Sequence, residues 1–173
     1  AFQRGIATVY QELSLVPSLT VAENMLLGRL PQRGPFIDWR ATYARAEAVL
    51  ADLQIDLDVR QRAGSLGVAQ QQVVEIAKAM SADPSVLMLD EPTSALARHE
   101  TDRLFALVRR LAARGVAIIY ISHRLQELHQ IADRITVLRD GHHIDTRAMA
   151  DTSAADIVHM MFGEVVQRPR PQD

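Results

Sequence analysis

Residues 86–93 read VLMLDEPT, and this segment constrains the fold more than any other part of the chain. Four apolar residues followed directly by two acids predict a buried strand that ends at Asp90, because a strand with both faces covered is apolar throughout. Ligands of open α/β sheets bind beyond the carboxyl ends of the strands. The sequence therefore predicts that Asp90 and Glu91 lie at a binding edge.

Two adjacent acids at such an edge can have different roles, because side chains alternate along a strand and the two carboxylates point in opposite directions. One carboxylate can hold Mg²⁺ together with water and phosphate oxygens, which is how this ion is usually bound. The other can polarise an attacking water. Two acids at a strand end can also be a cap and a surface charge, but the following residues PTSAL favour a site.

Strand and helix signals alternate in the second half of the chain. Buried strands are expected at 86–89 and 116–121, helices at 98–114 and 124–132, and a hairpin with its turn at Asp140-Gly141. A further buried strand is expected at 5–10 and a last helix ending at Gly163. This alternation predicts an α/β fold with a parallel sheet.

The block 18–82 interrupts the alternation with helix signals. Thr20 and Glu23 form a capping box for one helix, and Asp38 caps a second. Three helices are expected in the block, running to about Arg29, from Asp38 to about Leu53, and from about Gly67 to a point before Pro84. These signals predict that the block is an inserted helical subdomain.

Composition narrows the classes of function. The formal net charge of −2 shows no basic excess of the kind that nucleic-acid binders carry. The chain has no cysteine, which excludes disulfides, thiolate metal sites and thiol nucleophiles. Its longest apolar run, 116–121, is about a third of a membrane span, and no secretory signal is visible at its start. Any connection to a membrane is expected to run through another protein.

Four motifs resemble those of ABC ATPases and stand in the order of that family. They are VYQE at 9–12, which resembles the Q-loop, GSLGVAQQQVVEIAK at 64–78, which resembles the signature and its helix, VLMLDEPTSAL at 86–96, which resembles the Walker B motif and D-loop, and YISHR at 120–124, which resembles the H-loop. The resemblance covers nearly the whole chain. It implies a P-loop NTPase-like ABC ATPase core with an inserted helical subdomain, and ATP and Mg²⁺ as cofactors.

The resemblance also implies a division of the chain. The expected parts are the strand and Q-loop at 1–17, the helical subdomain at 18–82, the core with Walker B, D-loop and H-loop at 83–163, and a linker or disordered tail at 164–173. No glycine is followed by lysine, so the P-loop pattern is absent from these residues. We expect the N-terminal β-subdomain and the P-loop to be missing from a fragment that binds ATP weakly or not at all. Its uncovered sheet edge is expected to promote aggregation.

The resemblance implies a role in ATP binding or hydrolysis for residues of each motif. Gln11 would offer its amide oxygen to Mg²⁺ and the lytic water, and Asp90 would hold Mg²⁺ directly or through water. Glu91 would be the general base, and His123 would contact the γ-phosphate. The signature lies at a helix N-terminus, where backbone N–H groups favour a phosphate, and would act on ATP held by the other half of a dimer. Its residues are Leu66, Gly67, Val68, Ala69 and Gln70.

The sequence departs from the family pattern in the signature and in the D-loop. Gly67 stands where the signature has serine, Ala69 where it has glycine, and Ala97 where the D-loop has aspartate. These departures predict a weakened signature and doubtful communication through the D-loop. Glu91 and His123 match the pattern, so the site built around them is expected to be the hydrolytic one.

Longer stretches such as VYQELSLVPSLTVAENMLLGR resemble the N-terminal half of the tandem ATPase subunits of ribose- and galactose-type sugar importers. This implies ATP-driven import of a ribose-, galactose- or xylose-type sugar from the cytoplasmic face of the bacterial inner membrane. The implied partners are transmembrane permease subunits, a second ATPase half and, indirectly, a periplasmic sugar-binding protein. A nucleoside importer and an inactive truncated remnant remain open, whereas the charge disfavours an ABC ATPase working on nucleic acid.

Overall fold

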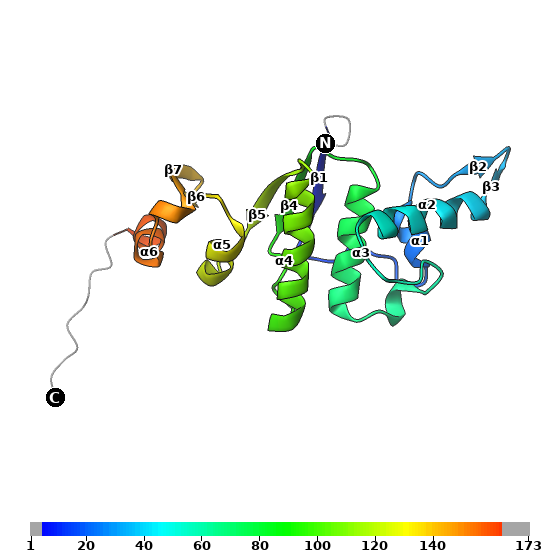
Figure 1. Ribbon diagram of the computed structural model, residues 1–173, viewed down its shortest axis with the longest axis horizontal. Helices are drawn as coiled ribbons and strands as arrows, with labels where there is room; N and C mark the ends of the chain where they lie inside the picture. Colours follow the sequence, from blue (N-terminus) through cyan, green and yellow to red (C-terminus); the bar gives the residue numbers. More distant parts are fainter. Residues whose placement is uncertain (1–4, 164–173) are drawn as a thin grey trace. The chain divides into compact units, whose positions relative to one another are not determined.

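The computed structural model describes residues 5–163, which form two compact units with a boundary between Ile121 and Ser122 (Figure 1). The first unit contains β1 (Ile6–Val9), α1 (Val21–Met25), β2 (Gln32–Arg33), β3 (Phe36–Ile37), α2 (Trp39–Asp52), α3 (Val68–Met80), β4 (Val86–Asp90), α4 (Arg98–Ala113) and β5 (Ala117–Ile121). The second contains α5 (Leu125–Ile131), β6 (Arg134–Arg139), β7 (His142–Ala148) and α6 (Ala154–Phe162). Single 3-10 turns occupy Ala63–Ser65 and Met149–Asp151. No helix within residues 5–163 is long and apolar enough to cross a lipid bilayer.

The sheet of the first unit is parallel, with the strand order β1-β4-β5. Its register pairs Val9 with Leu89 and Asp90 with Ile121. Leu87 and Leu89 of the central strand are fully buried, while the alternate residues of β4 are only half-buried. The predicted α/β fold with a parallel sheet is confirmed, although one face of β4 is less covered than its apolar sequence implied.

The prediction of a second fully buried strand is wrong for β5. Ile119 and Ile121 are 45% and 43% exposed, and the strand alternates between exposed and half-buried residues. The exposed residues alternate along β5, so they share one face of the strand, and this face lacks the cover that an apolar sequence implied. Within residues 5–163 β5 pairs only with β4 and lies at an edge of the sheet. An apolar run does not distinguish a central strand from an edge strand.

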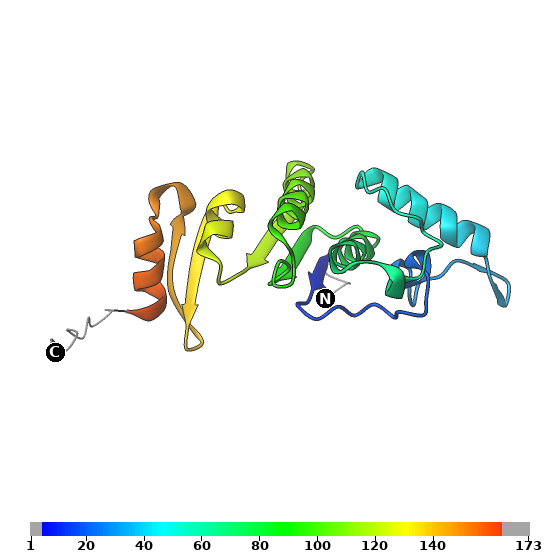
Figure 2. The same cartoon turned by 90° about the horizontal axis from the view of Figure 1, so that it is seen from below.

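The helical block follows the predicted caps. Thr20 forms the expected capping box with Glu23, and Asp38 caps α2 by accepting the amide N–H of Ala41. The first helix ends at Met25, earlier than predicted, since the chain turns at Leu26. The break expected before α2 contains the short antiparallel pair of β2 and β3, which was not predicted. In both ribbon views α3 lies between the sheet and α1 (Figure 2), and it packs against both β1 and α1.

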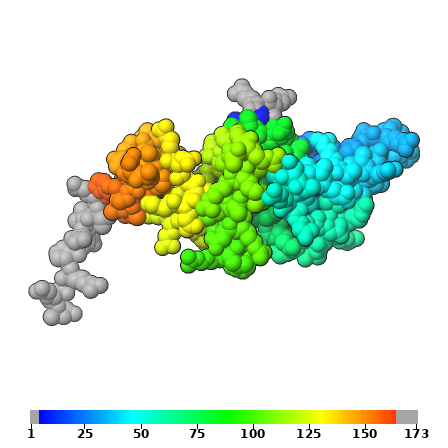
Figure 3. Space-filling view, viewed as in Figure 1, coloured from blue at the N-terminus to red at the C-terminus, as the bar shows by residue number. Residues whose placement is uncertain are grey.

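The outer face of α4 forms part of the surface of the first unit (Figure 3). Its exposed residues include Arg103, Arg109 and Arg110. Its opposite face is buried and supplies Leu104, Phe105, Leu107, Val108 and Leu111 to the core. Charged residues therefore occupy one face of α4 and apolar residues the other, as is typical of a helix that packs on a core.

The second unit is an antiparallel pair of strands with helices α5 and α6. The predicted turn at Asp140-Gly141 joins β6 to β7, and both residues have positive φ angles, 50° and 76°. Ser153 caps the start of α6, whose last residue is Phe162, and the predicted terminator Gly163 is its C-cap. The tail predicted at 164–173 lies outside the described residues.

Candidate functional site

The carboxyl-terminal edge of the parallel sheet brings three of the predicted residues together. Because Val9 pairs with Leu89, the chain continues from β1 to Gln11 at the level where it continues from β4 to Glu91. Asp90 and Glu91 are half-buried, and Gln11 is exposed. An amide oxygen and two carboxylates thus lie at the edge where open α/β sheets bind ligands.

Glu91 has an unusual backbone conformation. Its φ angle is +45°, in the left-handed region that non-glycine residues rarely adopt. Its N–H donates a hydrogen bond to the carbonyl of Ile121 at 3.0 Å, which ties this residue to the end of β5. Strained conformations of this kind persist where the surroundings impose them, and they cluster at functional sites.

Buried neighbours support the turn that follows Glu91. Thr93 is only 1% exposed, and its hydroxyl lies 3.5 Å from the Tyr120 hydroxyl on β5. The Tyr120 ring packs edge-to-face on buried Phe105 of α4, with the centroids 6.0 Å apart. The sequence analysis did not find this support, although Thr93 stands within the motif that contains Glu91.

His123 lies just after β5, at the start of the second unit, and is exposed. Buried Glu127 organises this segment by accepting hydrogen bonds from Ser122 Oγ at 3.3 Å and from Arg124 at 3.2 Å. The role of His123 at the γ-phosphate stays a prediction.

The predicted signature forms the start of α3. Gly67 is the N-cap, and its N–H donates to Gln70 Oε1 at 3.2 Å, while Leu66 is buried. Val68 and Gln70 are exposed, and Ala69 is half-buried. A Cβ atom at Gly67 would meet only Gln70 Oε1, at 4.0 Å, so there is room for a Cβ atom at the position where the family pattern has serine.

A groove of about 550 Å³ brings the signature and the D-loop together. Gly67, Ala69 and Gln70 line it from α3, and Leu96 lines it from the segment before α4. Gln72 also lines the groove, is only 5% exposed, and has no hydrogen-bond partner for Nε2 among the described residues. The sequence analysis did not single out Gln72, whose Nε2 donor is buried beside the predicted signature.

The donor set at the sheet edge fits Mg²⁺ that arrives with a nucleotide. Within residues 5–163 no group of three or more histidine, aspartate or glutamate residues is arranged to hold a metal ion. Mg²⁺ needs few protein oxygens when phosphate and water complete its octahedral shell. Asp90 and Gln11 supply oxygens of the right kind at one edge, and their assignment as ligands stays a prediction.

The family model of ABC transporters matches residues 1–94, which is more than half of the chain. The chain therefore belongs to the ABC transporter family. It is 51% identical, over 97% of its length, to an Agrobacterium fabrum protein whose name describes it as a ribose/galactose/methyl galactoside import ATP-binding protein. It is 49% identical to ribose import ATP-binding protein RbsA 2 of the same organism over 96% of its length, and 42% identical to a galactose/methyl galactoside import ATP-binding protein of Sodalis glossinidius over 99%.

The chain spans about one third of the length of these curated relatives, 34%, 33% and 34% respectively. Among solved structures, a nucleotide-free ATP-binding cassette of an ABC transporter matches 94% of the chain with a TM-score of 0.77 and 24% identity, and the chain covers 70% of it. The ADP conformation of another ATP-binding cassette matches 94% of the chain with a TM-score of 0.75 and 25% identity, and again 70% is covered. These likenesses confirm the predicted fold.

Proposed function

We propose that this chain is part of an ATP-binding subunit that hydrolyses ATP to drive sugar import across the bacterial inner membrane. The names of relatives up to 51% identical describe import of ribose, galactose and methyl galactoside. The observation that carries the proposal is the backbone of Glu91, which is held in a left-handed conformation at the sheet edge that it shares with Gln11 and Asp90.

Each side chain at this edge has a chemical task in hydrolysis. Glu91 polarises the attacking water and accepts its proton, as a positioned carboxylate does in general base catalysis. Asp90 contributes an oxygen to the Mg²⁺ shell, and Mg²⁺ neutralises charge on the transferred phosphoryl group when it is bound. The Gln11 amide oxygen orients the water, and His123 contacts the γ-phosphate.

These 173 residues contain no P-loop, so their own contacts to ATP are those of the sheet edge and the signature. The signature residues Leu66 to Gln70 act on ATP held by a second ATPase half. The proposed partners in the membrane are permease subunits, which receive sugar from a periplasmic binding protein. The subunit then lies at the cytoplasmic face of the membrane.

The test is Glu91→Gln in the transporter assembled in proteoliposomes with its permease. We expect ATP hydrolysis to fall by a factor of about 10² to 10⁴, the range for loss of a general base. Glu47→Gln on α2 is the control, because Glu47 is exposed and far along the chain from the site. Retained hydrolysis in Glu91→Gln would disprove the assignment.

Uptake by the same vesicles tests the substrate class. Labelled ribose and galactose are supplied with the binding protein, and labelled nucleosides are supplied in parallel. We expect ATP-dependent uptake of the sugars alone. Uptake of nucleosides and not of sugars would replace the proposed substrate and leave the ATPase assignment in place.

A further inference from the structure

The hairpin of β2 and β3, which precedes α2, is exposed along its whole length. All four residues of its two strands are exposed, and Phe36 at 75% is the most exposed large apolar side chain among residues 5–163. Ile37 and Trp39 follow directly and are 37% and 44% exposed. In both ribbon views the hairpin lies on the side of the helical block that is remote from the parallel sheet (Figure 1). Three large apolar side chains therefore lie together at the surface.

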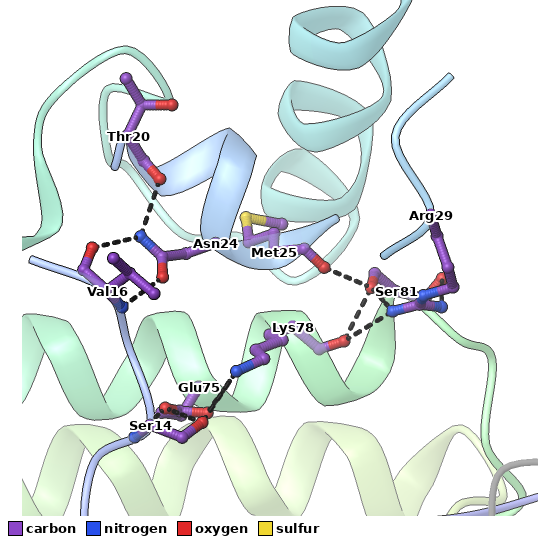
Figure 4. Close-up of polar contacts among 9 residues, drawn as sticks. All are labelled: Ser14, Val16, Thr20, Asn24, Met25, Arg29, Glu75, Lys78 and Ser81. Atoms are coloured by element: carbon purple, nitrogen blue, oxygen red, sulfur yellow. Dashed lines mark hydrogen bonds and ion pairs between the residues drawn. The ribbon is translucent and has the colours of Figure 1, made fainter. Parts of the chain in front are cut away.

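The base of the hairpin is fixed to the helical block. Arg29 donates to the Ser81 hydroxyl at 2.9 Å and to the Ser81 carbonyl at 3.3 Å, at the C-cap of α3 (Figure 4). The Asp38 N–H closes the hairpin by donating to the Pro31 carbonyl at 2.9 Å. The exposed apolar side chains are thus presented by a defined structure.

Two aromatic rings extend this surface along the first turns of α2. Trp39 and Tyr43 are four residues apart and share one helix face, and their rings stack with the centroids 6.1 Å apart. The guanidinium carbon of Arg60 lies 4.1 Å from the centroid of the Tyr43 ring, within the range of a cation–π interaction. Aromatic residues of this kind are enriched where proteins meet the interface between lipid and water.

The charge of this segment is opposite in sign to that of the whole chain. Residues 30–45 contain three arginines and one aspartate, which gives a net charge of +2, whereas the formal net charge of the chain is −2. In the part of the chain that the structure describes, the three exposed arginines form no ion pair with a carboxylate; they are Arg33, Arg40 and Arg45. The carboxylate of Asp38 is used to cap α2. The segment is therefore a cationic surface with exposed apolar side chains.

We propose that this surface, residues 30–45, binds an anionic phospholipid bilayer. Phe36 and Trp39 enter the headgroup region, and the arginines contact phosphate oxygens. Burial of apolar side chains and attraction to anionic lipids strengthen such interfacial contacts together. The place of this contact in the cell rests on the proposed function, whereas the binding itself needs neither ATP nor a permease.

The fluorescence of Trp39 tests the proposal, because Trp39 is the only tryptophan of the 173 residues. The full chain is titrated with vesicles that contain phosphatidylglycerol, without nucleotide and without permease. We expect the emission of Trp39 to shift to shorter wavelength and to be quenched by phospholipids brominated on their acyl chains. Vesicles of phosphatidylcholine alone are expected to bind at least about tenfold more weakly. Added salt is expected to weaken binding to the anionic vesicles, because it screens exposed charges.

Two substitutions with matched controls locate the contact. Phe36→Ser removes the exposed ring and is expected to weaken vesicle binding at least about tenfold, and Arg33→Gln is expected to weaken it about fivefold. Phe162→Ser is the control for the ring, since Phe162 is 69% exposed on α6. Arg103→Gln is the control for the charge, since Arg103 is exposed on α4. Both controls are expected to bind like the wild type.

Three results would overturn the proposal. The first is an unchanged emission of Trp39 with anionic vesicles, and the second is binding that both Phe36→Ser and Arg33→Gln leave unchanged. The third is a shift that appears only when a permease is present in the vesicles, which would assign the surface to a protein partner. Hydrolysis in Glu91→Gln is measured separately, so failure of the lipid contact is distinguishable from failure of the proposed function.

Discussion

The parallel sheet β1-β4-β5 and the antiparallel pair β6-β7 are held together by different means. In the parallel sheet, Ile6 pairs with Val86, so the strands come from distant parts of the chain and depend on a buried centre at Leu87 and Leu89. In the antiparallel pair, a two-residue turn joins the strands directly. The comparison teaches that the parallel sheet depends on burial of distant segments, whereas the antiparallel pair combines a local turn with buried side chains of its own, Ile135 and Val137.

In β5, regular strand pairing occurs without the burial that its apolar sequence predicts. It has the apolar composition of a central strand, yet Ile119 and Ile121 are almost half exposed. Its pairing with β4 is regular from Ala117 to Ile121. Apolar sequence and burial are therefore not equivalent here.

The largest expected effect is the loss of burial in the centre of the parallel sheet. Leu89→Ala removes a fully buried side chain and is expected to lower the free energy of unfolding by about 2–5 kcal/mol. Leu138→Ala on β6 is the control, since Leu138 is 69% exposed and its truncation should change stability by less than about 0.5 kcal/mol. Urea unfolding measures the free energy of unfolding of both variants. Equal losses would contradict the view that the parallel sheet depends on its buried centre.

The next effect concerns the turn of the antiparallel pair. Gly141 has φ 76° and a Cβ there would meet nothing within 4 Å, so Gly141→Ala acts through backbone conformation alone. We expect a cost of about 1–2 kcal/mol, measured as faster amide exchange across β6 and β7. Asp140→Asn should leave the pair unchanged, because Asn-Gly favours the same turn. An unaffected pair in Gly141→Ala would show that burial, and not the turn, specifies β6-β7.

A smaller effect on stability is expected at the exposed face of β5. Ile119→Lys should change the free energy of unfolding by no more than about 0.5 kcal/mol while reducing aggregation measured by light scattering, since edge lysines block strand addition. Ile119→Val keeps the edge apolar and should aggregate like the wild type. A large loss of stability in Ile119→Lys would mean that this face is covered.

The smallest effect is a dependence on pH in the second unit. The hydrogen bond from Ser153 lowers the pKa of Asp156 from its ordinary value of 3.8. A depressed pKa means that the stabilisation is present above the ordinary value and is lost as the pH falls through the folded-state value. The difference in melting temperature between the wild type and Asp156→Asn should therefore be positive at neutral pH and shrink towards zero in acid. A difference that persists in strong acid would show that it does not come from the charge of Asp156.

Much of the local structure could be predicted because the signals are themselves local. Thr20 with Glu23 and Asp38 before Trp39 specify helix starts through side-chain bonds to nearby N–H groups. Asp140-Gly141 specifies a turn because both residues tolerate positive φ. The motif at Asp90 and Glu91 predicted a strand end, and β4 ends at Asp90.

Other features needed contacts between segments that are far apart in the sequence. Glu91 has a left-handed backbone conformation, and its N–H is bonded to the carbonyl of Ile121. The sequence DEPT contains no signal that predicts this conformation. The sequence shows Glu75 only as a polar residue of a helix. The folded chain brings Ser14 to it, and the Ser14 N–H donates a hydrogen bond to the Glu75 carboxylate. The sequence shows Gly64 only as part of the predicted signature, whereas in the folded chain its N–H donates a hydrogen bond to the Pro17 carbonyl at 3.0 Å.

The sequence by itself determined the family, the α/β class, the helix caps, the hairpin turn and the order of the motifs, because these depend on residues close together in the chain. Tertiary structure decided which apolar strand is central and which is an edge, since burial depends on what packs from elsewhere. It also decided which polar side chains connect the loop after Gln11 to the signature helix. A buried carboxylate such as Glu75 is stable only with partners that the folded chain supplies.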